Sequence, residues 1–264
     1  MADDLKKKIR SLMCRVRQHG RLPGSEQIVS EAFERLGLVE GRIDPREVID
    51  QFEPVLRSVW EEALGVLESY ENRAYSTGIP RELIRSFPKD VKSAQRMARA
   101  RGFQAGVTHL LANWYCHLRL CFLSVSQSRK TRGGKDFELQ LERLLSLAGV
   151  AYETQVTENR TDFVLPSIAV FQRNRNEALV VSAKRTLRER WREVAEELFN
   201  LRSPNVYLLT ADENVSPGHV DAICGRYNIY LVVWEHLKEA RFRDRPLVLS
   251  YGAWARERLA RLRP

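Results

Sequence analysis

The stretch VVSAKRTLRERW, residues Val180–Trp191, decides how the second half of this chain folds. It begins with β-branched and small residues, which favour a buried strand, and changes at Lys184 into a dense run of charges. We therefore predict a strand over residues 178–183 and a helix over residues 188–201. Lys184 is placed where the strand ends, so its chemistry depends on what neighbouring segments bring to that point.

The segments on either side alternate short apolar runs with amphipathic ones. We predict helices over 136–148 and 218–227, and strands over 151–156, 162–165, 205–210 and 229–234. Together with the first stretch, the order is α-β-β-β-α-β-α-β. That order predicts an α/β fold with a mixed central sheet flanked by helices.

The first half of the chain has a helical pattern, with apolar residues three and four apart. Asp44 and Pro45 predict one helix start, because the aspartate can cap free amides and the proline occupies the first helical position. We expect a helical N-terminal region over 1–128 and an α/β core over 129–264. Residues 128–135 are basic and contain two glycines, which predicts a loop. It is either a solvated linker or a basic loop beside a nucleic-acid groove.

The composition favours a globular protein with a polyanionic partner. The 264 residues include 43 Lys and Arg against 34 Asp and Glu, a formal net charge of +9, and 44% are hydrophobic. The four cysteines have neither zinc-knuckle spacing nor the density of a disulfide scaffold. The N-terminus is charged and no apolar run is long enough to span a bilayer, so we expect a cytoplasmic protein without a membrane partner.

Three residues suggest phosphodiester chemistry. If the strands that carry Asp162 and Lys184 are adjacent, the carboxylate can hold Mg²⁺ on a scissile phosphate while the ammonium stabilises charge and orients water. A surface ion pair is the ordinary alternative. Ser182 stands where an acid usually precedes such a lysine, and Glu197 on the following helix can supply the missing carboxylate.

Asp162, the triplet Ser182–Lys184 and Glu197 resemble the permuted active site of type II restriction endonucleases of the PD-(D/E)xK superfamily. The group in question is EcoRII-like, SsoII-like and PspGI-like, and its sites have CCGG, CCNGG or CCWGG cores. The likeness implies the restriction-endonuclease fold, Mg²⁺, and a catalytic set of Asp162, Lys184 and Glu197. Two positions are less typical. Thr161 replaces the expected proline, and Glu138, which resembles an auxiliary glutamate near the metal, would also be ordinary on an exposed helix face.

Base recognition is predicted for Arg188, Glu189 and Arg190, because arginine matches guanine O6 and N7 and glutamate accepts from cytosine N4. In the resembling family this triplet reads the CC/GG half-site. A salt-bridged helix start is the structural alternative. Four further cations are predicted to contact DNA phosphates: Arg185, Arg192, Lys130 and Lys135.

The resemblance also implies extrusion of the central bases, with Arg57 and Trp60 as a candidate flipped-base pocket. A tryptophan on an amphipathic helix is more often a core residue. His109 and His117 have no third ligand at useful spacing and are expected to be packing residues. No glycine-rich phosphate loop is present, so we expect no nucleotide cofactor.

The sequence thus predicts a prokaryotic, Mg²⁺-dependent restriction endonuclease that cuts double-stranded DNA at a short palindrome with a CC/GG core. A palindrome with one scissile bond per strand implies a homodimer, with the N-terminal helices serving dimerisation and backbone contacts. Two alternatives stay open. One is a structure-specific or repair nuclease of the same superfamily, and the other is a DNA-binding protein that has lost catalysis.

Overall fold

The computed structural model describes residues 2–18, 22–154, 161–187 and 191–262. The chain divides into two compact units, a helical unit of Met1–Ile28 and Ala63–Arg132 and a sheet unit of Val29–Glu62 and Gly133–Pro264. The division differs from the expected one, because residues 29–62 belong with the sheet rather than with the N-terminal helices. Their apolar side chains, Phe52 and Leu56 among them, are part of the core that surrounds the sheet.

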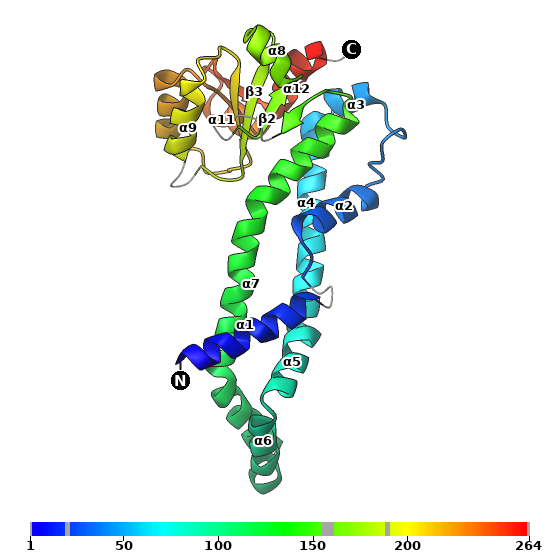
Figure 1. Ribbon diagram of the computed structural model, residues 1–264, viewed down its shortest axis with the longest axis vertical. Helices are drawn as coiled ribbons and strands as arrows, with labels where there is room; N and C mark the ends of the chain where they lie inside the picture. Colours follow the sequence, from blue (N-terminus) through cyan, green and yellow to red (C-terminus); the bar gives the residue numbers. More distant parts are fainter. Residues whose placement is uncertain (1, 19–21, 155–160, 188–190, 263–264) are drawn as a thin grey trace. The chain divides into compact units, whose positions relative to one another are not determined.

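Helices are the only regular secondary structure among the described residues of the first half of the chain (Figure 1). Their bounds are α1 Ala2–Gln18, α2 Ser25–Arg35, α3 Pro45–Asp50, α4 Phe52–Arg73, a π-helical turn Ala74–Gly78, α5 Ile79–Ser86, α6 Pro88–Arg101 and α7 Phe103–Leu147. The predicted start at Asp44 is confirmed, since its carboxylate accepts from Arg46 N at 2.8 Å. No described helix is both long enough and apolar enough to cross a bilayer.

The helical unit has its own core. Apolar side chains of α1, spaced three and four apart, are buried with Leu83 of α5 and with Trp114 and Cys121 of α7. An ion pair closes this core, because Arg15 Nε donates to Glu82 Oε2 at 2.7 Å. The Glu82 side chain is only 7% exposed, so this ion pair helps to stabilise a buried charge.

The sheet unit is built on six strands in sequential order, β1 to β6. They are β1 Glu153–Thr154, β2 Phe163–Leu165, β3 Leu179–Lys184, β4 Val206–Thr210, β5 Tyr230–Val233 and β6 Val248–Ser250. The pairs β1–β2 and β2–β3 are antiparallel, whereas β3 to β6 run parallel. Strands β3 and β4 are buried along almost their whole length, as parallel strands covered on both faces must be. The predicted mixed sheet is confirmed.

Helices cover both faces of this sheet. They are α8 Ile168–Arg173, α9 Trp191–Asn200, α10 Pro217–Val220, a π-helical turn Asp221–Arg226, α11 Glu235–Arg241, α12 Tyr251–Glu257 and a 3₁₀ turn Leu259–Leu262. In Figure 1, α9 and α12 lie on opposite sides of the strands. The C-terminal part of α7 adds Phe137, Leu141 and Leu144 to the same core.

The predicted loop at 128–135 is wrong, because these residues lie inside the 45-residue helix α7. Each interior glycine costs a helix about 1 kcal/mol relative to alanine. Gly133 has a packing reason, since a Cβ there would collide with the guanidinium of Arg185. Apolar turns on both sides of the two glycines are buried and carry the helix through them.

Candidate active site

Strand pairing brings Asp162 beside the end of β3. Asp162 directly precedes β2, and its amide donates to the carbonyl of Val181 at 3.2 Å. The antiparallel register pairs Phe163 with Val181, so Asp162 falls opposite Ser182. The predicted adjacency of the two strands is thus present, and it follows from backbone hydrogen bonds.

Three donors converge on one oxygen of Asp162. Its Oδ2 accepts from the amide of Ala183 at 2.7 Å, the Oγ of Ser182 at 2.9 Å and the Nζ of Lys184 at 3.0 Å. These bonds fix the carboxylate and stabilise its charge. Its Oδ1 accepts no hydrogen bond from the residues that the structure describes. One carboxylate oxygen is therefore held by the protein while the other stays available to a ligand.

The pair remains open to solvent. The side chain of Asp162 is 16% exposed and that of Lys184 is 29% exposed, whereas Ser182 is fully buried. An acid at position 182 would place a second negative charge against Asp162 Oδ2, where the serine instead donates a hydrogen bond. The serine thus changes this position from a second anion into a support for the first.

Glu138 of α7 belongs to the same electrostatic neighbourhood. Burial, and then the negative charge of Asp162, raise the pKa of Glu138, while the positive charges of Lys184 and Lys135 oppose the shift. A half-buried carboxylate whose pKa is raised by another carboxylate is a place where a cation would be stabilised. The auxiliary glutamate predicted from the sequence therefore lies close enough to interact with Asp162 and Lys184.

Glu197 lies on α9, seven residues into the helix and half-buried. It makes no ion pair or hydrogen bond with another described residue. Within the described part of the chain, no three His, Cys, Asp or Glu side chains form a group that could hold a metal ion. Mg²⁺ commonly binds through only one or two carboxylates, with water and phosphate oxygens completing its shell. The carboxylates present therefore fit this ion chemically, although the structure does not gather all three.

The remaining predicted contacts are distributed around this centre. Arg188, Glu189 and Arg190 lie outside the described residues, as does the side chain of Lys130. The other candidate phosphate contacts are placed as follows: Arg185 lies over the Trp60 ring at 5.1 Å, Arg192 is exposed with its guanidinium over Trp191 at 5.4 Å, and Lys135 is exposed.

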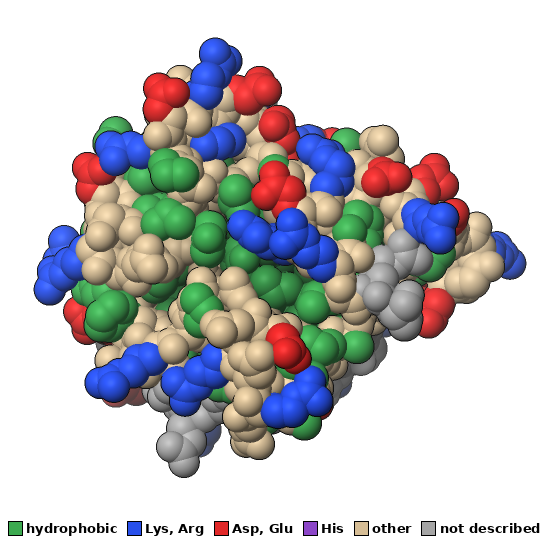
Figure 2. All heavy atoms as spheres, turned by 90° about the horizontal axis from the view of Figure 1, so that it is seen from above, with side chains coloured by type: hydrophobic (Ala, Val, Ile, Leu, Met, Phe, Trp, Pro, Cys, Tyr) green, Lys and Arg blue, Asp and Glu red, His purple; other side chains and the backbone are tan. Residues whose placement is uncertain are grey.

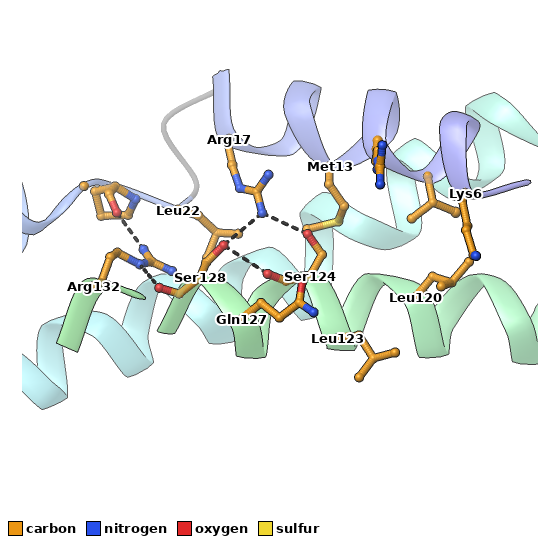
Figure 3. Close-up of a pocket in the computed structure, with 14 residues that line it drawn as sticks. Lys6, Met13, Arg17, Leu22, Leu120, Leu123, Ser124, Gln127, Ser128 and Arg132 are labelled. Carbon is orange, nitrogen blue, oxygen red and sulfur yellow. Dashed lines mark hydrogen bonds between the residues drawn. The ribbon is translucent and has the colours of Figure 1, made fainter. Parts of the chain in front are cut away.

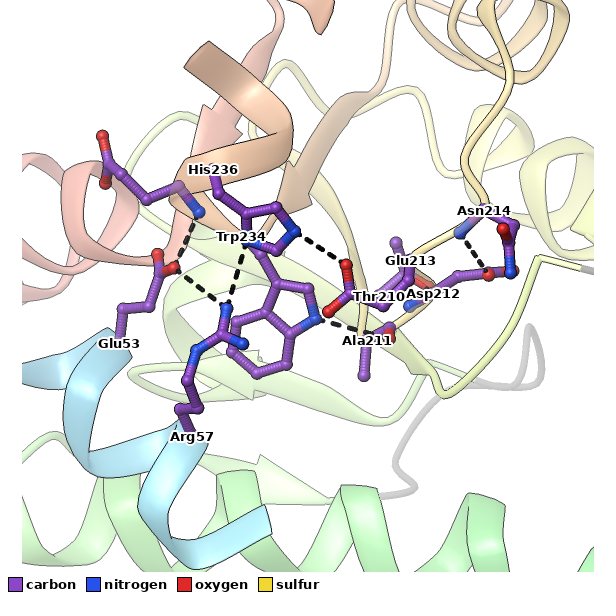
Figure 4. Close-up of polar contacts among 10 residues, drawn as sticks. Glu53, Arg57, Thr210, Ala211, Asp212, Glu213, Asn214, Trp234 and His236 are labelled. Atoms are coloured by element: carbon purple, nitrogen blue, oxygen red, sulfur yellow. Dashed lines mark hydrogen bonds and ion pairs between the residues drawn. The ribbon is translucent and has the colours of Figure 1, made fainter. Parts of the chain in front are cut away.

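Arg57 and Trp60 face different partners. The Arg57 guanidinium lies 4.5 Å from the centroid of Trp234, and its Nη2 lies 3.3 Å from His236 Nδ1 (Figure 4). Trp60 packs edge-on against the buried ring of Phe137, with ring centroids 5.8 Å apart. The aromatic partner of Arg57 is therefore Trp234, which follows β5, and sequence spacing alone gave no sign of it.

Two further acidic groups support this edge of the sheet, and sequence reasoning missed both. Asp212, just after β4, accepts from Leu187 N at 2.8 Å and so anchors the segment that follows Lys184. The Oε2 of Glu213 lies at hydrogen-bond distance, 2.8 Å, from His236 Nε2. The other ring nitrogen of His236 contacts Arg57, so the histidine links Glu213 to Arg57 (Figure 4). Their position in the sequence could have indicated this, because both residues follow a predicted strand, and side chains that follow neighbouring parallel strands meet at one edge of a sheet.

Comparison with known proteins places the chain in a family. The family model described as EcoRII C terminal matches residues 116–247. The chain is 31% identical over 146 residues to the type II restriction enzyme SsoII of Shigella sonnei, covering 51% of this chain and 48% of that protein. It is 34% identical over 100 residues to the type II restriction enzyme EcoRII of Escherichia coli, covering 35% and 24%. The chain thus spans about half of one curated relative and a quarter of the other.

Two solved structures share the fold. Metal-depleted Ecl18kI in complex with uncleaved DNA matches with a TM-score of 0.78 at 22% identity, over 99% of this chain and 85% of that one. The PspGI restriction endonuclease in complex with substrate DNA matches with a TM-score of 0.58 at 19% identity, over 91% and 93%. At these identities the likeness concerns the fold, which is that of restriction endonucleases.

Proposed function

The chain belongs to the EcoRII C-terminal family, and from that premise we propose that it is a type II restriction endonuclease. It hydrolyses both strands of duplex DNA at a short palindrome with a CC/GG core, of the CCNGG or CCWGG type. The observation that carries this proposal is the Lys184 Nζ at 3.0 Å from the Asp162 Oδ2, with Ser182 as the second support of that oxygen.

Asp162 and Glu197 would hold Mg²⁺, with Glu138 as an auxiliary group. When bound, the ion supplies positive charge to the scissile phosphate. Lys184 orients the attacking water and stabilises the negative charge that develops on the phosphoryl oxygens. Water adds its oxygen to phosphorus, the phosphorus–oxygen bond to one sugar breaks, and that oxygen leaves with a proton. The three donors on Asp162 keep the carboxylate in place during this step.

Arg188, Glu189 and Arg190 would read the CC/GG half-site, because they lie four to six residues after Lys184 and would thus couple recognition to cutting. Arg185, Arg192, Lys130 and Lys135 would contact phosphates. Two chains related by a twofold axis would present two such sites to a palindrome. Extrusion of the central base pair would use Arg57 and Trp60 as supports for the flipped bases. We place the enzyme in the cytoplasm of a prokaryote.

Plasmid digestion tests the central claim. With Mg²⁺ we expect discrete fragments whose sequenced ends share one palindrome, and with EDTA we expect none. Random nicking would favour a repair nuclease, and binding without cleavage in Mg²⁺ would favour an inactive DNA-binding protein. Either result refutes the restriction proposal.

Glu189→Ala tests base reading separately. A restriction enzyme that loses this cytosine acceptor should lose preference for its site by about 1–3 kcal/mol per base pair. An unchanged set of sequenced ends would remove the triplet from the proposal while leaving the cleavage centre intact.

The homodimer is tested by size-exclusion chromatography. Elution of the chain as a monomer, with and without a site-containing duplex, would contradict it.

A further inference from the structure

Helix α6 carries a row of four cations on one face. Lys89, Lys92, Arg96 and Arg99 are spaced three, four and three residues apart and are all exposed. At 3.6 residues per turn they fall within an arc of about 80° and extend along about 15 Å of helix. With Gln95 they line a shallow surface groove. We call these four residues the α6 cationic face.

No acidic group compensates this face. Among the described residues, none of the four makes an ion pair or hydrogen bond. Some other basic side chains of the helical unit are paired, as Arg15 is with Glu82 and Arg129 is with Glu68. Like charges three or four residues apart destabilise a helix by about 0.2–0.5 kcal/mol per pair. Nothing described within the fold offsets that cost, which an external polyanion would.

A second basic groove in the same unit shows the contrasting case. It lies between α1 and α7, has a volume of about 700 Å³, and includes Arg17 and Arg132 in its lining (Figure 3). Arg17 Nη2 donates to the hydroxyls of Ser124 and Ser128 at 2.9 and 3.0 Å, and Arg132 Nη1 donates to the Pro23 carbonyl at 2.7 Å. These two guanidinium groups are therefore held by contacts within the unit, unlike the four cations of the α6 cationic face.

The sheet unit offers no comparable concentration of charge on the face seen from above in Figure 2. Basic and acidic side chains are interspersed there among hydrophobic and uncharged groups. The net charge of +9 is thus not gathered on that face. This makes the uniform row on α6 the more distinctive surface.

We propose that the α6 cationic face binds the sugar-phosphate backbone of duplex DNA without reading its sequence. Duplex DNA carries one negative charge per about 1.7 Å, so a 15 Å row of cations meets several phosphates. The groove lining contains no aromatic side chain on which unpaired bases would stack, and no apolar side chain that would enter a bilayer. The inference rests on the proposed function only for its choice of DNA as partner.

The test compares two double variants of equal charge. Lys92→Gln with Arg96→Gln removes the centre of the face. Lys6→Gln with Lys8→Gln removes two exposed lysines of α1 that already pair with Asp3 and Asp4. Binding to a 30-base-pair duplex without a CC/GG sequence is measured in EDTA over a range of salt concentrations. Thermal unfolding of both variants verifies that they fold.

We expect the α6 variant to bind on the order of tenfold more weakly at low salt, and the slope of log affinity against log salt to fall by about 1.8, because two phosphate contacts are lost. The α1 variant should match the wild type. Equal duplex binding and equal salt slopes for the two variants would overturn the proposal. Wild-type cleavage with Mg²⁺ is assayed in parallel, so a failure of the nuclease proposal is recognised separately.

Discussion

Two ion pairs, one in each unit, have similar geometry and opposite character. Arg15 and Glu82 in the helical unit lie 2.7 Å apart, and Lys184 and Asp162 in the sheet unit lie 3.0 Å apart. Arg15 also donates to the hydroxyls of Ser11 and Ser86, so each of its three nitrogens has a partner within the fold. Lys184 has one partner among the described residues and Asp162 keeps one oxygen uncommitted.

The difference teaches how to distinguish a structural ion pair from one suited to chemistry. The structural pair uses its hydrogen-bonding capacity inside the fold, and removing one member leaves a buried charge. In the sheet unit, all three hydrogen bonds to Asp162 go to its Oδ2. The charges of the pair also act on a second carboxylate, since Asp162 raises and Lys184 lowers the pKa of Glu138. A carboxylate oxygen without a partner among the described residues, rather than the N···O distance, therefore marks the candidate site.

Lys184→Ala should have the largest effect, and it should act on catalysis rather than on stability. Loss of a charge that acts on the transition state costs on the order of a thousandfold in rate. Stability should change little, because Asp162 retains Ser182 and Ala183 as donors. Initial rates of plasmid cleavage measure the effect, with Lys8→Ala as the control. Discrete fragments at an undiminished rate would show that Lys184 is not the catalytic lysine.

Arg15→Met should give the reverse result. The carboxylate of Glu82 would be left buried beside an apolar chain, lowering the free energy of unfolding by about 3 kcal/mol. Arg85→Met is the matched control, because Arg85 is 69% exposed and lies 3.8 Å from the same glutamate. Its effect should stay below about 1 kcal/mol. Urea unfolding compares the two, and equal losses would mean that burial of the pair is not what matters.

Ser182→Ala tests whether the hydroxyl that donates to Asp162 positions this carboxylate. Removing one of three donors loosens Asp162 without removing a reacting group, so we expect about tenfold slower cleavage. The Mg²⁺ concentration needed for half-maximal rate should rise, which a purely structural role would not cause. Ser146→Ala, an exposed hydroxyl in the same unit, is the control. An unchanged metal dependence would count against Ser182 as a positioning residue.

Glu138→Gln should have the smallest effect, on stability. The folded protein raises the pKa of this carboxyl. Its contribution to the free energy of unfolding is therefore most favourable below the ordinary pKa near 4.5, and it is lost as the pH rises through the raised pKa of the folded state. The variant cannot ionise and should be more stable than the wild type at pH 7, with the gap closing in acid. Thermal unfolding from pH 4 to 8 measures this, and a gap that widens in acid would refute the assignment.

The sequence by itself determined the part of the site that depends on local pattern. A Val-rich run ending at Lys184 and a short apolar run after Asp162 were enough to predict two strands, and adjacent strands place both residues at one point. The caps and periodicities that define most helices are likewise local. These predictions succeeded because strand and helix periods are written in neighbouring residues.

Only the tertiary structure decided what depends on distant contacts. Helix α7 continues through Gly133 and Gly134 because apolar turns on both sides of them are buried in the two cores. The guanidinium of Arg57 lies over Trp234, which is remote in the sequence, and β6 forms from three residues with too short a pattern to predict. Such choices follow from the packing of the whole chain, in which burial and hydrogen bonds between remote segments outweigh local preference.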